Sequence, residues 1–216
     1  MAATDLQPTQ DLDTRLDQPD QAPRSRGPRG LGLSELAYHF VGGLKANAKA
    51  YIAVTAPTVN SYKRLVIGAP TSGATWAPAY ISYGYNNRTQ MLRIPGPGRV
   101  EDRTVDGSCN PYLAATAMLA AGLDGIERGL DPGEPNSANL YEYSEAERGE
   151  QGIEVLPANL LDAVRELEKN DVLRAALGKT RDGDYIDYYA KVKLREWQAA
   201  HEQITAWELE RYLQLF

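Results

Sequence analysis

Residues 88–103 read RTQMLRIPGPGRVEDR, and this stretch decides the fold class. Residues 88–94 and 99–104 predict two strands, and the Gly-Pro-Gly at 96–98 predicts the turn between them. Upstream, residues 78–85 predict another strand, because the Asn pair that follows it tolerates the positive φ of a tight turn. We therefore expect antiparallel strands in the middle of the chain.

Helical patterns lie on both sides of these strands. Ser34 can cap a helix that runs to about residue 49, and its Gly-Gly pair at 42–43 predicts close packing against another element. Asn110 followed by proline is a typical helix start, here for residues 111–128. Further helices are expected at residues 157–177, 184–201 and 205–215, and Gly178 is suited to end the first of them. The predicted fold class is α+β with a helical C-terminus.

Composition limits the possible classes of protein. The chain has 216 residues, a formal net charge of −6 and one cysteine, Cys109, which excludes a disulfide framework and a cysteine-rich zinc site. No apolar run approaches the roughly 18–20 residues of a membrane span, so we expect a cytoplasmic protein that does not enter membranes. Residues 1–28 are expected to form a disordered tail, or a segment that folds on a partner. Residues 29–216 are expected to form the folded domain.

The charge is unevenly distributed. Between Glu35 and Glu101 there is no acidic residue, whereas seven cationic residues occur there. They are Lys45, Lys49, Lys63, Arg64, Arg88, Arg93 and Arg99. Such a block predicts a surface that collects anions. The tyrosines do not alternate with the basic residues as in a base-stacking surface, which favours a small phosphate or carboxylate over nucleic acid.

The pattern Arg99-x-Glu101-x-Arg103 is the most informative cluster. Alternate residues of a strand project from one face, so these three side chains are expected on the same side. A carboxylate between two guanidinium groups stays ionised and could bind Mg²⁺ while the arginines hold phosphate or carboxylate. A surface ladder of ion pairs remains the alternative.

Other candidate groups have simpler explanations. His39 fits a packing role, His201 a solvent-facing position and Cys109 a buried small residue. The glycine-containing loop at residues 68–75 lacks the P-loop pattern.

Six blocks of sequence carry a family resemblance. They are Asn60-Ser61-Tyr62-Lys63-Arg64-Leu65, Asn87-Arg88, Leu92-Arg93-Ile94-Pro95, Arg99-Val100-Glu101-Asp102-Arg103, Asn110-Pro111-Tyr112-Leu113 and Ala120-Ala121-Gly122-Leu123-Asp124-Gly125-Ile126. In order and spacing, they resemble the C-terminal half of glutamine synthetase. The likeness covers about residues 28–216 and implies part of that family's catalytic domain.

The resemblance implies an enzyme that phosphorylates the side-chain carboxylate of glutamate with ATP and then lets ammonia displace the phosphate. By position, Arg64 would hold substrate glutamate and Arg103 would bind its carboxylate. Arg88 would be the catalytic residue, in contact with both the ATP phosphate and the intermediate. The remaining positions would be Arg93 and Arg99 at the nucleotide and Glu101 at a Mg²⁺ or Mn²⁺ ion. A role in glutamine biosynthesis and a homo-oligomeric ring are also implied.

The chain also departs from the family pattern. Trp76 stands where the family has the glutamate of Glu-Ala-Pro, which suggests a branch that joins glutamate to an alkylamine such as methylamine. The N-terminal β-domain and most metal-binding glutamates have no counterpart, so we expect the chain alone to be inactive. The alternative is a non-catalytic remnant, or a subunit that co-assembles with full-length subunits. Tyr141 resembles the tyrosine that is adenylylated in some members, or is an ordinary loop tyrosine.

Overall fold

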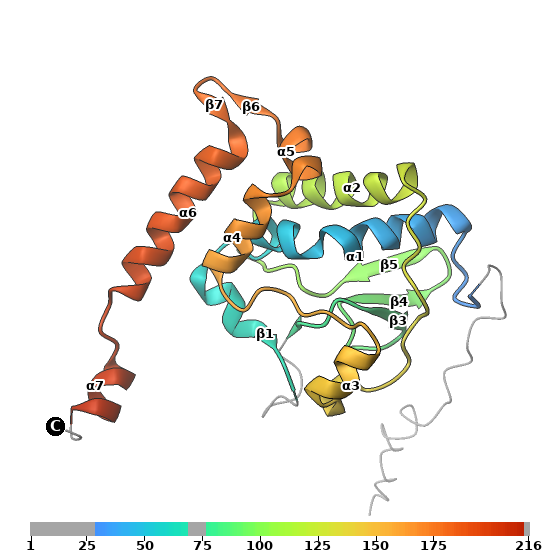
Figure 1. Ribbon diagram of the computed structural model, residues 1–216, viewed down its shortest axis with the longest axis horizontal. Helices are drawn as coiled ribbons and strands as arrows, with labels where there is room; N and C mark the ends of the chain where they lie inside the picture. Colours follow the sequence, from blue (N-terminus) through green and yellow to red (C-terminus); the bar gives the residue numbers. More distant parts are fainter. Residues whose placement is uncertain (1–28, 69–76, 214–216) are drawn as a thin grey trace, which may run out of the picture.

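The structure, a computed structural model, describes residues 29–68 and 77–213. Its centre is helix α1 (Glu35–Thr55), which lies between helix α2 (Pro111–Glu127) and a three-stranded sheet of β3 (Tyr83–Tyr85), β4 (Leu92–Gly96) and β5 (Arg99–Asp102) (Figure 1). The other elements are η2 (Val59–Arg64), β1 (Leu65–Val66), β2 (Ala77–Pro78), η3 (Leu140–Glu142), α3 (Glu145–Glu150), α4 (Leu160–Glu168), α5 (Asp171–Leu177), β6 (Lys179–Thr180), β7 (Gly183–Asp184), α6 (Tyr185–His201) and α7 (Ala206–Tyr212). The α+β class is confirmed. The expectation for residues 1–28 lies outside the described residues.

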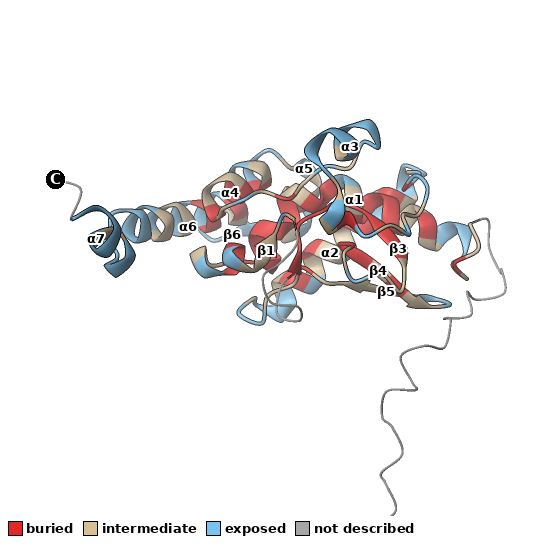
Figure 2. Ribbon diagram, turned by 90° about the horizontal axis from the view of Figure 1, so that it is seen from below, coloured by how far each residue is buried: buried red, intermediate tan, exposed pale blue. Residues whose placement is uncertain are grey.

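Helix α1 begins where the sequence predicts and ends later. The Ser34 hydroxyl accepts a hydrogen bond from the Ala37 N–H, as expected of an N-cap. The helix continues to Thr55, so the predicted end at about residue 49 is too early. Tyr51, Ile52 and Val54 are buried in the core, and this packing extends the helix almost to Pro57. Figure 2 shows α1 as one of the most buried parts of the molecule.

The contact between α1 and α2 depends on glycine. A Cβ atom on Gly43 would lie 2.1 Å from the Ala121 carbonyl oxygen, and one on Gly125 would lie 2.2 Å from the His39 carbonyl oxygen. No side chain fits between backbones at these distances. The predicted close packing of the Gly-Gly pair is confirmed, and α2 is the partner.

The strands around the turn at 96–98 are antiparallel, as predicted, with Arg93 opposite Glu101. The predicted tight turn at Asn86-Asn87 is wrong, because β3 and β4 run parallel with Tyr83 opposite Leu92. The connection goes through a turn in which the Asn87 carboxamide oxygen accepts hydrogen bonds from the N–H and hydroxyl of Thr89. Asn86 nevertheless has a positive φ of 45°.

The C-terminal helices are more divided than predicted. The single helix expected over 157–177 is two helices, because Asn170 accepts a hydrogen bond from the Leu173 N–H and starts α5. Gly178, with φ of 70°, ends α5 as predicted. Helix α6 extends away from the body toward α7, which has no buried residue (Figure 1). Within the described ranges, no helix is long and apolar enough to span a membrane.

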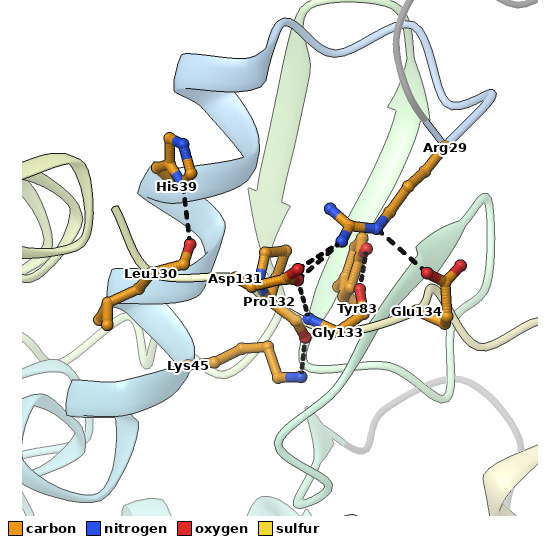
Figure 3. Close-up of polar contacts among 9 residues, drawn as sticks. All are labelled: Arg29, His39, Lys45, Tyr83, Leu130, Asp131, Pro132, Gly133 and Glu134. Atoms are coloured by element: carbon orange, nitrogen blue, oxygen red, sulfur yellow. Dashed lines mark hydrogen bonds and ion pairs between the residues drawn. The ribbon is translucent and has the colours of Figure 1, made fainter. Parts of the chain in front are cut away.

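The loop that follows α2 makes hydrogen bonds to several other parts of the fold. The Arg29 guanidinium binds both carboxylate oxygens of Asp131 at 2.7 and 2.8 Å, and the Tyr83 hydroxyl donates to the Gly133 carbonyl at 2.6 Å (Figure 3). From α1, Lys45 donates to the Pro132 carbonyl, and His39 Nδ1 lies 3.0 Å from the Leu130 carbonyl oxygen. This loop therefore connects α1, β3 and the first described residues.

Candidate active site

Three of the predicted side chains meet on the face of β4 and β5. Arg93 Nη1 lies 3.1 Å from Glu101 Oε2, and Arg103 Nη1 lies 3.0 Å from Glu101 Oε1. The pairing follows from register, because Arg93 is opposite Glu101 across the strands and Arg103 is two residues further along. We call Arg93, Glu101 and Arg103 the arginine row. The expectation that Glu101 and Arg103 share a face is confirmed.

The arginine row is only partly removed from solvent. The two arginine side chains are each 21% exposed and that of Glu101 is 33% exposed. Arg93 also donates from Nε to the Asn86 carboxamide at 3.0 Å, whereas Arg103 Nε is buried with no hydrogen-bond partner among the described residues. The guanidinium groups are therefore held in place and still accessible to a polar ligand.

Arg64 is held by a residue that the sequence patterns did not single out. It is the last residue of η2, and its Nη1 lies 2.7 Å from Asp106 Oδ2 in the loop between β5 and α2. Burial works to raise the pKa of the Asp106 carboxyl, but hydrogen bonds from the Ser108 N–H and hydroxyl and from Arg64 outweigh it and lower the pKa to about 2. The signal in the sequence was an Asp-Gly-Ser turn close to the arginines.

Arg88 and Arg99 lie apart from these contacts. Arg88 is exposed in the turn before β4, so the expectation that the strand of residues 88–94 begins with it is wrong. Arg99 is exposed at the start of β5. Neither makes an ion pair with the part of the chain that the structure describes. Both guanidinium groups are therefore accessible to solvent or to a ligand.

Within the described residues, three of the seven cationic residues of the basic block pair with carboxylates from later in the chain. Lys49 pairs with Glu154, in addition to the pairs that Arg64 and Arg93 form. Glu101, 8 residues from Arg93, belongs to a cluster that the sequence analysis singled out, whereas Glu154 lies 105 residues from Lys49 and no local pattern connects the two.

Two tyrosines border the site near Arg103. The rings of Tyr80 and Tyr141 are 6.0 Å apart, and the Tyr80 hydroxyl accepts a hydrogen bond from the Gly68 N–H at 2.6 Å. Burial raises the pKa of the Tyr141 phenol, against the opposing effect of the positive charge of Arg103. Tyr141 is thus partly covered, and its modification stays a prediction. Cys109 is half-buried, so the expectation of a buried small residue is wrong.

The described residues do not form a metal site by themselves. They contain no group of three or more His, Cys, Asp and Glu side chains placed to hold an ion. Glu101 offers one carboxylate, and arginines already contact both of its oxygens. A divalent ion normally needs several oxygen ligands, so Glu101 could be at most one of them.

An α+β domain with a row of arginines on its strands fits a binder of small anions. Residues 20–212 match the family model of the glutamine synthetase catalytic domain. The chain therefore belongs to the glutamine synthetase family.

Individual relatives agree with this assignment. The chain is 51% identical over 187 residues to glutamate–methylamine ligase from Methyloversatilis universalis, covering 87% of this chain and 41% of that protein. It is 48% identical over 197 residues to glutamine synthetase from Pyrococcus woesei, covering 84% of this chain and 42% of that protein. A solved structure described as a GmaS/ADP complex aligns with a TM-score of 0.75 at 47% identity, covering 89% of this chain and 42% of that one. The chain thus spans about two fifths of the length of these relatives.

Proposed function

We propose that the chain carries the phosphate- and glutamate-binding part of an ATP-dependent ligase that joins the side-chain carboxylate of glutamate to ammonia or a small amine. The observation that carries the proposal is the arginine row in a member of the glutamine synthetase family. A glutamate carboxylate oxygen would attack the γ-phosphorus of ATP, giving γ-glutamyl phosphate and ADP. The amine would then attack the acyl carbon, and phosphate and a proton would leave as the amide forms.

The arginines have separate roles in this scheme. Arg93 and Arg99 would neutralise nucleotide phosphates, and Arg88 would contact the transferring phosphoryl group from its exposed turn. Arg64 and Arg103 would hold glutamate through its carboxylates. Guanidinium groups suit all these roles, because they are permanently charged and bind oxyanions with two parallel hydrogen bonds. Positive charge placed beforehand stabilises charge that develops in phosphoryl transfer.

A bound Mg²⁺ or Mn²⁺ ion would neutralise phosphate charge, with Glu101 as one of its ligands. The described residues contain no group of three or more side chains of metal-ligating type around such an ion. We therefore assign the steps only to groups of this chain, and expect the chain alone to lack catalysis.

Methylamine is the acceptor that we favour. The support is the 51% identity to a glutamate–methylamine ligase, although the 48% identity to a glutamine synthetase keeps ammonia as the alternative. Trp76, on which the sequence argument for an alkylamine rested, lies outside the described residues.

A second candidate is a non-catalytic remnant, or a subunit that modifies the assembly of an oligomer of full-length subunits. Trp207 on α7 is 62% exposed and Leu213, just after the helix, is 74% exposed, and large exposed apolar side chains close together suit a contact with another chain. In this role the chain would co-assemble with full-length subunits in the cytoplasm.

Calorimetry with ADP tests the principal proposal without requiring turnover. We expect the folded chain to bind ADP, Arg93→Gln to weaken binding about tenfold, which corresponds to the loss of one charge-assisted contact, and Arg195→Gln to have no effect. Arg195 is the matched control because it is exposed on α6. No binding by the folded wild-type chain would contradict the proposal and favour the non-catalytic subunit.

A further inference from the structure

Asp106 contacts Arg64, a proposed substrate-binding arginine, and is itself held by hydrogen bonds through its side chain and its backbone. We propose that Asp106 is a positioning residue that orients the Arg64 guanidinium toward the carboxylate of the substrate, an inference that rests on the proposed function. The two residues are 42 positions apart in sequence and meet through a 2.7 Å contact between Arg64 Nη1 and Asp106 Oδ2.

The two oxygens of Asp106 have different partners. Oδ1 accepts from the Ser108 N–H at 2.8 Å and from the Ser108 hydroxyl at 2.7 Å. Oδ2 is left for Arg64. The carboxylate plane is therefore fixed by its own turn, and the direction of Oδ2 fixes where the guanidinium group lies.

The backbone of Asp106 is fixed as well. Its N–H donates to the Thr55 carbonyl at the end of α1 at 2.8 Å, and its carbonyl accepts from the Cys109 N–H at 3.0 Å. Because α1 is the central helix of the fold, this hydrogen bond fixes Asp106, and through it Arg64, relative to the core. The Asp106 side chain is 14% exposed, and its low pKa keeps it ionised near neutral pH.

Arg64 retains capacity for a ligand. Its side chain is 35% exposed, and within the described part of the chain only Nη1 donates to a partner. The Nε and Nη2 edge can therefore bind a carboxylate with two hydrogen bonds while Nη1 stays on Asp106. The same ion pair would also form if it only tethered η2 to the loop before α2. Ligand-binding measurements are therefore needed to distinguish a positioning role from a purely structural one.

The test compares glutamate and ADP affinities of the purified chain by calorimetry. In Asp106→Asn, glutamate affinity should fall about tenfold, which is the scale of a lost charge-assisted hydrogen bond. ADP affinity, which depends on Arg93 and Arg99 in the proposed function, should stay within about twofold of wild type. Ser108→Ala, a milder variant, should weaken glutamate binding about threefold, and Asp106→Glu should restore part of the loss. In an Arg64→Gln background, Asp106→Asn should have no further effect on glutamate affinity.

Several outcomes would overturn the inference. Equal loss of glutamate and ADP affinity in Asp106→Asn would mean that the pair is a structural tether. Tighter glutamate binding would mean that Asp106 competes with the substrate for Arg64. If the wild-type chain binds ADP but not glutamate, the positioning role is wrong although the nucleotide part of the proposed function stands. If it binds neither ligand, the proposed function fails and the positioning role fails with it.

Discussion

The α1–α2 interface and the arginine row are built in opposite ways. At the interface, the contact consists of backbone atoms, and a single added Cβ on Gly43 would meet a carbonyl oxygen at 2.1 Å. In the arginine row, long side chains meet around one carboxylate while 21–33% of their surface stays exposed. Shape determines the first region and charge the second. Substitutions should therefore change stability at the interface and ligand binding at the row.

The largest effect is expected for Gly43→Ala. The new methyl group has to displace the α2 backbone, and overpacking of this kind costs about 3 kcal/mol of unfolding free energy. Urea denaturation measures the loss. Gly149→Ala is the matched control, because this helical glycine on α3 has open space around its Cα and should gain up to about 0.5 kcal/mol. Equal stability of the Gly43 variant and wild type would show that α1 and α2 can move apart without cost.

Tyr51→Phe is expected to have the next largest effect, because it breaks the connection between the two regions. The Tyr51 hydroxyl on α1 donates to Asp102 on β5 at 2.7 Å. Burial raises the pKa of Asp102, and the hydrogen bonds from Thr104 and Tyr51 oppose that shift by stabilising the carboxylate. Loss of a bond to a buried charge should reduce the unfolding free energy by about 2 kcal/mol.

Tyr189→Phe is the control for this variant. Its hydroxyl donates at 2.7 Å to the neutral carbonyl of Ala53, so a smaller loss of about 1 kcal/mol is expected. If the two losses in urea denaturation are equal, the charge of Asp102 does not strengthen its bond to Tyr51.

The sequence predicted more of the interface than of the arginine row. The Gly-Gly pair at 42–43 indicated close packing before its partner was known, because glycine inside a helix is costly unless backbones must approach. The alternation of Glu101 and Arg103 was also readable, because it depends only on strand geometry.

Contacts that depend on the topology of the chain could not be predicted from the sequence. The parallel pairing of β3 and β4 was missed, because a short connection with an Asn pair is typical of an antiparallel hairpin. Asp106 and Glu154 were missed as partners of the basic block, because nothing local links them to Arg64 and Lys49. The spacing of the arginines alone fitted either a ligand site or a surface ladder of ion pairs. The family resemblance favoured the ligand site and supplied a role for each residue.

Asp106→Asn should reveal the electrostatic character of the site through pH. The folded pKa of Asp106 is about 2 and lies below the unfolded value of about 3.9. The hydrogen bonds from Ser108 and the ion pair with Arg64 therefore stabilise the fold through the charged form of Asp106 above pH 4. Their combined charge-dependent contribution, on the order of 1 kcal/mol, is lost as pH falls through 2. Urea denaturation between pH 7 and 2.5 should show wild type approaching the variant. A constant difference over this range would mean that Asp106 stabilises the fold without its charge.

The smallest effect on stability is expected for Glu101→Gln, at the centre of the arginine row. Its partners are partly exposed, and ion pairs of this kind contribute about 0.5 kcal/mol, less at high salt. The variant leaves Arg93 and Arg103 without a counter-ion, so any anion that binds between them replaces the lost charge. We therefore expect inorganic phosphate to raise the melting temperature of Glu101→Gln more than that of wild type. Lys49→Gln, which breaks a surface pair elsewhere on the chain, should respond to phosphate as wild type does. A similar response of all three proteins would show that Glu101 does not neutralise an anion site, and that the arginine row is a surface ladder of ion pairs.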